Sequence, residues 1–413
     1  MTMRGGVLQA RDDVHERLPT RLPLVVYVLA LGTFLMGTTE FVVAGLLPEI
    51  AGDLRVDVAQ AGLLITVFAL GMIVGAPLMA MLTLRLPRRL TLMLALGVFA
   101  AGHVVVALGS SFALLLGARF LTALATGAFW AVANVAAARA AGPAAGSRAL
   151  GVVGAGAMLA NVVGVPLGAF AGQLMGWRGP FWALAALAAL AAAAIALIAR
   201  AVPDDGAARD AGSIRSELAA LRSGRLWLVL AACATTTGGV LAAYSYISPL
   251  LTGRAGLSAG LLPLALVGFG VGALAGSIVG GRLGDARPHT VTIVAAAGAT
   301  LLLLAICLLS GYAAVAVLLV ALLGFFGLGA NPVLMSLAVR FAGRAPVLAS
   351  ALTISAFNFG TAVGSWIAGL ALGSSLGTTG PAVVGTAIAA LTLIPAIAIA
   401  LTRRRRSAAA AMT

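Results

Sequence analysis

Long apolar runs, each about as long as a membrane is thick, recur along the whole of this 413-residue chain. A helix that crosses the hydrocarbon core of a bilayer needs about 20 mostly apolar residues, and twelve runs meet this requirement. Their approximate limits are 22–48, 58–82, 90–109, 112–138, 150–172, 180–200, 226–250, 260–281, 290–310, 313–339, 348–372 and 381–401. Only 9% of the residues are charged and 62% are hydrophobic, which is too little polar surface for a water-soluble fold of this size. The sequence therefore predicts an all-α membrane protein with twelve transmembrane helices.

The 26 basic residues are all arginines, and their distribution indicates the orientation of the chain. Arg55, Arg178 and Arg254 lie in one set of loops and Arg119 lies inside a predicted span, whereas the remaining 22 lie in the tails, the central loop and the other loops. Because arginine-rich loops stay on the cytoplasmic side, we expect both termini and the central loop in the cytoplasm. The net charge of +14 thus indicates membrane topology rather than nucleic-acid binding.

The second half of the chain repeats the first at an offset of 201 residues. The matching pairs are Pro48 and Pro249, Gly71 and Gly272, Gly75 and Gly276, Leu82 and Leu283, Arg139 and Arg340, and Gly142 and Gly343. The repeat predicts two pseudo-symmetric six-helix halves, 22–200 and 226–402, around a central cavity that opens to each side in turn. A cytoplasmic tail (1–21), a central loop (201–225) and a basic tail (403–413) complete the chain. Within the central loop, an apolar spacing at Ile214, Leu218 and Leu221 favours a short helix on the membrane surface, and a simple tether is the alternative.

The connection after the second span and its repeat mate carry a sequence motif. The first copy reads AMLTLRLPRRL and keeps Arg85, Arg88 and Arg89, and the second reads GRLGDARPH and keeps Gly281 and Asp285. Together they resemble the cytoplasmic loop motif of the major facilitator superfamily. That resemblance covers essentially the whole chain and implies the same twelve-helix fold. In the family an acidic residue of this loop helps to hold the halves together in one state. Leu84 stands at that position in the first copy, whereas Asp285 keeps it in the second.

The fifth predicted span contains LANVVGVPLGAFAG. Gly164, Pro166, Gly168 and Gly172 in this segment resemble the family's export motif, which occurs mainly in proton antiporters. Glycine at every fourth residue also gives a helix one smooth face for close packing, and the proline permits bending. Plain helix packing is therefore the alternative interpretation.

Two ionisable residues lie inside the first half of the predicted bundle. Glu40 is the one acid well inside a span, and Arg119 lies near the outer edge of the fourth span, where it resembles a membrane-buried arginine of the family. Ionisable residues within membranes are costly and usually functional. Burial favours a neutral Glu40 and a nearby Arg119 favours the carboxylate, so we predict that Glu40, with Arg119 beside it, couples transport to protons. A permanently protonated Glu40, and an Arg119 that reaches to the outer surface, are the alternatives.

Several aromatic and amide-bearing side chains are candidates for a substrate cavity that admits a ring-bearing compound. They are Thr39, Trp130, Asn134, Tyr244, Tyr246, Phe325, Phe326 and Asn331. Packing against lipid or within the core is the alternative for each aromatic ring, and the asparagines are also expected to bridge helices. His103 is interpreted as a packing residue rather than as part of a proton relay.

The segment GTTEFVVAGLLPEIAGDL resembles the first span of a bacterial drug and sugar efflux branch of this superfamily, and GAPLMAMLTLRLPRR and GGRLGDARP resemble its chloramphenicol exporter subgroup. This implies a monomeric drug:proton antiporter of the bacterial inner membrane. It would expel chloramphenicol or a related small neutral antibiotic and use the proton gradient without a metal or other cofactor. Export of sugars or other metabolites is the alternative. The sequence shows no catalytic constellation that would favour a membrane enzyme.

Overall fold

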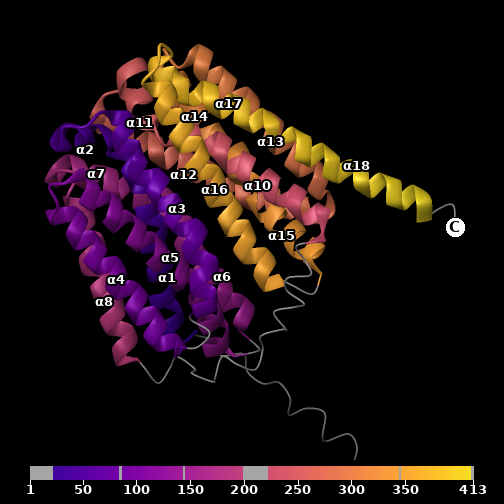
Figure 1. The fold of residues 1–413 in the computed structure, drawn as a ribbon, viewed down its shortest axis with the longest axis horizontal. Helices are drawn as coiled ribbons and strands as arrows, with labels where there is room; N and C mark the ends of the chain where they lie inside the picture. Colours follow the sequence, from indigo (N-terminus) through magenta and orange to yellow (C-terminus); the bar gives the residue numbers. More distant parts are fainter. Residues whose placement is uncertain (1–21, 83–85, 143–144, 199–221, 344–345, 411–413) are drawn as a thin grey trace, which may run out of the picture.

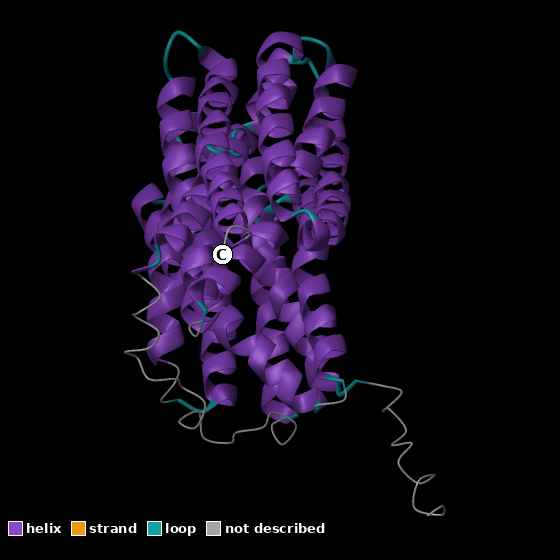
Figure 2. Ribbon diagram, turned by 90° about the vertical axis from the view of Figure 1, so that its right-hand side faces the viewer, coloured by secondary structure: helices purple, strands orange, loops and turns teal. Residues whose placement is uncertain are grey.

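The computed structural model describes residues 22–82, 86–142, 145–198, 222–343 and 346–410. Within these residues all regular structure is helical, as Figure 2 shows, and twelve helical segments are long and apolar enough to cross a membrane. The predicted fold class is therefore confirmed. The N-terminal tail and most of the central loop, with its predicted surface helix, lie outside the described residues.

The first half contains six spans, two of which are interrupted. Its elements are α1 (Leu24–Val42), η1 (Val43–Gly45), α2 (Leu47–Leu54), α3 (Val58–Leu82), α4 (Arg88–Leu108), α5 (Phe112–Ala141), α6 (Gly146–Leu159), η3 (Ala160–Gly164), α7 (Val165–Met175) and α8 (Gly179–Leu197).

The second half also contains six spans, with interruptions in its first, fourth and sixth spans. Its elements are α10 (Gly224–Tyr244), α11 (Ile247–Pro249), η6 (Leu250–Arg254), η7 (Ala259–Leu261), α12 (Leu262–Ala286), α13 (Pro288–Leu309), α14 (Ala313–Gly329), α15 (Asn331–Ala342), α16 (Pro346–Leu372), η8 (Gly377–Thr379), α17 (Gly380–Leu391) and α18 (Leu393–Ala410). The last helix continues through the four arginines to Ala410, so most of the predicted basic tail is helical.

The interruptions in the first span of each half occur at matching prolines. The first span breaks at η1, just before Pro48, and the seventh span breaks after Tyr244, just before Pro249. Proline has no N–H to donate and its ring clashes with the carbonyl four residues earlier, so a regular helix cannot continue through it. The sequence repeat is thus also a repeat of local backbone structure.

The repeat extends to the way the helices pack. Side chains added at Gly71 and Gly75 of α3 would collide with α5, and side chains at their mates Gly272 and Gly276 of α12 would collide with the backbone of α14. In both halves, glycines let the second and fourth spans approach closely.

The two ends of the bundle differ in how the halves meet. Near α2 and α11 both halves contribute to one apolar core, which includes Leu46, Leu47, Tyr244 and Leu266. At the other end each half has a core of its own, one drawn from residues 22–195 and the other from residues 226–399. Figure 1 shows the halves converging toward α2 and α11 and diverging toward α6 and α15. We call these the closed end and the parted end.

Candidate functional site

Glu40 lies between the two halves, on the last turn of α1. Its side chain lines a small cavity with Phe41 of the same helix, with Phe68 of α3, and with residues of the second half on α10 and α16, including Tyr244 and Asn358. The cavity measures about 10 Å³, which is room for about one water molecule. Glu40, the predicted proton-coupling residue, therefore faces the interface between the halves, near the closed end.

Arg119 is buried in the second turn of α5, with 1% of its surface exposed. Its Nη1 donates to the backbone oxygen of Thr39 at 3.0 Å and to Oγ1 of Thr39 at 2.8 Å, and its Nε donates to the oxygen of Leu64 at 3.4 Å. The guanidinium lies over the ring of Phe68, 4.2 Å from the centroid. An arginine does not lose its proton in a protein, so these oxygens and the aromatic face stabilise a buried cation.

Arg119 and Glu40 are neighbours without forming an ion pair. Thr39, which accepts both Nη1 bonds, precedes Glu40 directly. Among the described residues, however, no nitrogen of Arg119 lies within 4.0 Å of the Glu40 carboxyl oxygens. The Nη2 group of Arg119 is buried and has no hydrogen-bond partner in the described part of the chain. One donor of a buried cation thus remains unused on an arginine that binds Thr39, the residue next to Glu40.

The glycines of the export-like segment pack on the first span. Added side chains at Gly164, Gly168 and Gly172 would collide with Thr38, Val42 and Leu46 respectively, so two four-residue repeats lie face to face. The turn before Pro166 is a π-helix, Ala160–Gly164. Proline has no N–H to donate, and the wider π-helical turn lets the span continue past it. The segment therefore supports the helix that carries Glu40, while its predicted role in export stays a prediction.

The two copies of the loop motif lie at the parted end. Arg89 donates from Nη2 to the oxygen of Ala196 at 3.1 Å, which ties α4 to the end of α8. Arg88 is half-buried, and Arg85 and Leu84 lie outside the described residues. In the second copy Gly281 is half-buried and Asp285 is exposed, and Asp285 has no ion-pair partner within the described residues.

The structure separates the candidate cavity residues into groups, and only Tyr244 among them lines the cavity at Glu40. Thr39 is fully buried and its hydroxyl is used by Arg119 and His103. Tyr246 is buried at the closed end and donates to the oxygen of Ser365 at 3.2 Å. Neither side chain is free to meet a substrate in this conformation, because each already fills a packed position.

The remaining candidates lie elsewhere. Phe325 and Phe326 line a groove of about 320 Å³ between α12, α13 and α14, away from the interface that holds Glu40. Asn134 is exposed, and Trp130 and Asn331 are half-buried. The Nε1 atom of Trp130 and the Oδ1 atom of Asn331 are buried without a hydrogen-bond partner in the described part of the chain.

Two residues of α16 line the cavity without being among the predicted cavity residues. They are Asn358, which the sequence predicts to bridge helices, and Thr361. The eleventh span carries polar residues at 358, 361 and 365, a three- and four-residue spacing that puts them on one helix face. Ser365 on this face pairs with Thr66 of α3 at 2.9 Å, across the two halves. The spacing of these polar residues in the sequence therefore indicates that this face of α16 contacts the first half.

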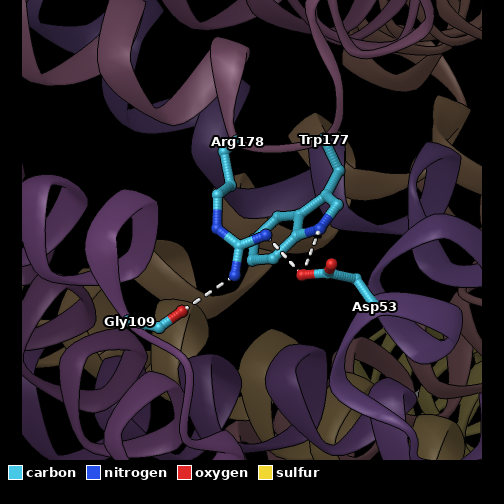
Figure 3. A network of polar contacts seen from close by, with 4 residues as sticks. All are labelled: Asp53, Gly109, Trp177 and Arg178. Carbon is cyan, nitrogen blue, oxygen red and sulfur yellow. Dashed lines mark hydrogen bonds and ion pairs between the residues drawn. The ribbon is translucent and has the colours of Figure 1, made fainter.

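A polar network fastens the loops of the first half at the closed end (Figure 3). Asp53 of α2 accepts hydrogen bonds from Arg178 and, at 3.2 Å, from Nε1 of Trp177, and Nη2 of Arg178 donates to the oxygen of Gly109 at 3.0 Å. The hydrogen bond from Arg178 lowers the pKa of Asp53. We call these four residues the closed-end clamp. The clamp joins the connections that follow the first, third and fifth spans.

Comparisons with known proteins agree with this architecture. The family profile described as Major Facilitator Superfamily matches residues 29–354. A chloramphenicol resistance protein of Streptomyces lividans is 38% identical over 377 residues, which cover 91% of this chain and 96% of that protein. The inner membrane transport protein YdhP of Escherichia coli K12 is 33% identical over 370 residues, or 89% of this chain and 93% of that protein.

A solved structure shows the same fold at low sequence identity. It is a bacterial homologue of the human lysosomal transporter Spinster, captured inward-facing and occupied, with a TM-score of 0.74 and 18% identity over 92% of this chain and 96% of that one. The family match, the relatives and the twelve-helix bundle lead to one conclusion. The chain belongs to the major facilitator superfamily and is a multi-pass membrane transporter rather than an enzyme.

Proposed function

We propose that the protein is a proton-coupled exporter of small, largely neutral antibiotics, with chloramphenicol as the first candidate. The observation that carries this proposal is the position of Glu40, a carboxyl group of the first half in a cavity that both halves enclose. A group at this interface changes its surroundings whenever the halves move. Its affinity for a proton therefore differs between the two states, which is the requirement for coupling.

Arg119 gives Glu40 a partner for its charged form. Among the described residues the two do not form an ion pair, as expected of a neutral Glu40. Loss of the proton creates a carboxylate on the residue next to Thr39, which Arg119 already binds. A small side-chain movement would then let the unused Nη2 donor of Arg119 bind it, and such a charge-assisted bond is strong where water is excluded. Release of the proton on one side and its uptake on the other then alternate with drug binding.

The direction of transport follows from the arginine distribution. The described arginines of the loop motif lie at the parted end, whereas Arg55, Arg178 and Arg254 lie at the closed end. If arginine-rich loops are cytoplasmic, the parted end faces the cytoplasm of a bacterial inner membrane and the closed end faces outward. Drug then enters from the cytoplasmic side, and opening of the closed end releases it.

The composition of the cavity supports a drug rather than a sugar. Its lining includes three aromatic rings, those of Phe41, Phe68 and Tyr244. Against these stand one amide, that of Asn358, and two aliphatic hydroxyls, those of Ser245 and Thr361. Aromatic faces favour ring-bearing compounds, whereas a sugar site needs many hydrogen-bonding groups. A cavity of about 10 Å³ is far below the ~300–1,000 Å³ of a drug site, so the halves must separate further around Glu40 to admit a ligand.

Uptake of radiolabelled chloramphenicol into inside-out vesicles with an acid interior tests the proposal. Wild-type protein should accumulate the drug, and Glu40→Gln should lose accumulation driven by the pH gradient while it still exchanges drug down a concentration gradient. Glu49→Gln is the matched control, because Glu49 is an exposed acid at the closed end and should leave accumulation unchanged. Full gradient-driven accumulation by Glu40→Gln would overturn the coupling role.

The same vesicles separate the two substrate classes. Gradient-driven accumulation of a labelled sugar without any accumulation of chloramphenicol would replace the proposed substrate with a metabolite. Competition between chloramphenicol and other neutral antibiotics would define how broad the specificity is.

A further inference from the structure

His103 of α4 is buried, with 1% of its surface exposed, and both of its ring nitrogens have partners. Nδ1 lies 2.7 Å from the oxygen of Phe99, and Nε2 lies 2.7 Å from Oγ1 of Thr39. The rings of Phe99 and Phe181 lie on its faces, 4.1 and 5.9 Å between centroids. The side chain does not line the cavity at Glu40, but one intermediate residue links it to Arg119.

The partners assign every proton in this chain of contacts. A carbonyl oxygen only accepts, so Nδ1 of His103 carries a hydrogen and donates it to Phe99. In the neutral ring Nε2 is then an acceptor, and the hydroxyl of Thr39 donates to it. The oxygen of that hydroxyl is left to accept from Nη1 of Arg119, at 2.8 Å. Donation therefore runs in one direction, from Arg119 through Thr39 and His103 to Phe99.

A second proton on His103 would disrupt this order. Nε2–H would then point at the hydroxyl oxygen that Arg119 already donates to, and a second cation would be buried beside the guanidinium. The charged groups near His103 are Arg119 on α5 and, one residue beyond Thr39, Glu40 on α1, while α8 presents Phe181. The cost of burying a second cation therefore favours a neutral His103, which suits a fixed acceptor and not a proton carrier.

We propose that His103 is a positioning residue, which orients the Thr39 hydroxyl so that Arg119 is held beside Glu40. Nη1 of Arg119 depends on Thr39 for both of its bonds, and Thr39 has a fixed hydroxyl only because His103 accepts from it. Without that acceptor the hydroxyl turns to other partners. Arg119 then loses the contacts that hold its guanidinium against the turn of α1 that carries Glu40. This inference rests on the proposed coupling role of Glu40.

The repeat supports a dedicated role rather than general packing. At the 201-residue offset, Thr39 and Arg119 correspond to Val240 and Val320, and His103 corresponds to Leu304. The second half therefore folds the same three spans with apolar side chains at these positions. A hydrogen-bonded network is not needed to build the fold, so its presence in the half with Glu40 points to function.

A double-mutant cycle tests the proposal in the inside-out vesicles. Thr39→Val and His103→Leu, which introduce the residue types of the second half, should each lower gradient-driven accumulation of chloramphenicol by about five- to tenfold. The double variant should be no worse than the more severe single variant, because both changes remove one interaction. Thr39→Ser, which keeps the hydroxyl, should restore accumulation to near the wild-type level.

Two further readouts separate positioning from a structural defect. The pH at which accumulation is half-maximal should rise measurably, by up to about one pH unit, in both single variants, because a displaced Arg119 stabilises the Glu40 carboxylate less. Thr126→Val is the control for loss of a buried hydroxyl, because Thr126 donates only within α5, to Thr122, in the described part of the chain. It should leave the pH midpoint unchanged.

Additive effects of Thr39→Val and His103→Leu, or a loss of thermal stability with an unchanged pH midpoint, would overturn the proposal. So would loss of transport in His103→Leu alone with normal transport in Thr39→Val, because His103 would then act independently of Thr39. If His103→Leu fails to fold, His103→Gln provides the test instead, because it keeps an acceptor for Thr39. It should transport at near the wild-type level, and loss of transport in a folded His103→Gln variant would overturn the proposal. Absence of any gradient-driven accumulation by the wild type would instead refute the proposed function.

Discussion

The two halves share a backbone plan but differ in the chemistry of their first, third and fourth spans. In the first half the buried Thr39 and Arg119 and the half-buried Glu40 form a polar site, whereas Val240, Leu241 and Val320 occupy the corresponding positions in the second. Both halves nevertheless break their first span before a proline and pack their second span on the fourth through glycines. The comparison indicates that the fold requires the glycines and prolines, and that the polar site is an addition to one half.

The closed end shows a similar contrast within a shared plan. In the first half Arg178 binds Asp53 and the oxygen of Gly109. In the second half Arg254, which stands at the repeat position of Asp53, donates from Nε to Ser310 at 3.0 Å. Both arrangements fasten the end of the third span to the connection after the first. Both halves thus make the same connection, with an aspartate at this repeat position in the first half and an arginine in the second.

Moving the acid from one half to the other gives the largest expected effect. Glu40 and Leu241 line the same cavity, so the double variant Glu40→Leu/Leu241→Glu keeps one acid there but removes it from the residue that follows Thr39. If coupling requires Arg119, gradient-driven accumulation should fall to the level of empty vesicles. Accumulation at the wild-type rate would show that any acid in the cavity suffices and that the halves are interchangeable in this respect.

Replacing the arginine by a lysine tests the geometry of the polar site. Arg119→Lys keeps the positive charge but loses the planar fork that reaches Thr39 and Leu64 together, and the two residues are not equivalent at such sites. Gradient-driven accumulation should fall by at least about tenfold, the cost of one or two charge-assisted hydrogen bonds. Normal accumulation by the lysine variant would show that charge alone is required.

The glycine faces of the two halves should differ in their tolerance of alanine. An added side chain at Gly364 of α16 would meet the backbone of Gly238, whereas one at Gly168 of α7 would meet the side chain of Val42. Because a backbone cannot move aside, Gly364→Ala should cost about 1–3 kcal/mol of stability, and Gly168→Ala should cost less.

Thermal unfolding in detergent measures this difference. Gly154→Ala is the matched control, because an added side chain at Gly154 of α6 meets nothing within 4 Å. Equal shifts of the melting temperature for Gly364→Ala and Gly168→Ala would contradict the contrast between a backbone contact and a side-chain contact.

Removal of the acid in the closed-end clamp gives the smallest expected effect. Asp53 is exposed, so its ion pair with Arg178 contributes less than about 1 kcal/mol. Because Arg178 holds the pKa of Asp53 below its usual value of 3.8, this stabilisation is present at neutral pH. It is lost progressively as the pH falls from that value through the lowered pKa of the folded protein. Asp53→Asn should therefore lower the melting temperature slightly at neutral pH and by less at pH 3. An equal loss at both pH values would show that the clamp acts through packing alone.

Much of the fold was readable from the sequence because the membrane leaves few choices. Twelve apolar runs had to become helices, since a backbone in hydrocarbon must satisfy its own hydrogen bonds, and the structure has twelve spans close to the expected limits. Glu40 and Arg119 stood out for the same reason, because an ionisable residue within such a run is costly. The offset of 201 residues located Pro48 and Pro249, and the helix breaks lie there.

What the sequence could not decide was the direction in which each side chain points. Thr39, Tyr244 and Tyr246 are equally plausible cavity residues by type, but only Tyr244 lines the cavity, while the other two are used in buried contacts. Likewise the sequence predicts only a packing role for His103, and its hydrogen bond arises because α1, α4 and α5 pack together and bring its Nε2 to Thr39. A membrane span has no water-exposed side from which its inward-facing side could be inferred. The apolar composition therefore determined where the spans lie. Only tertiary packing decided which polar groups meet.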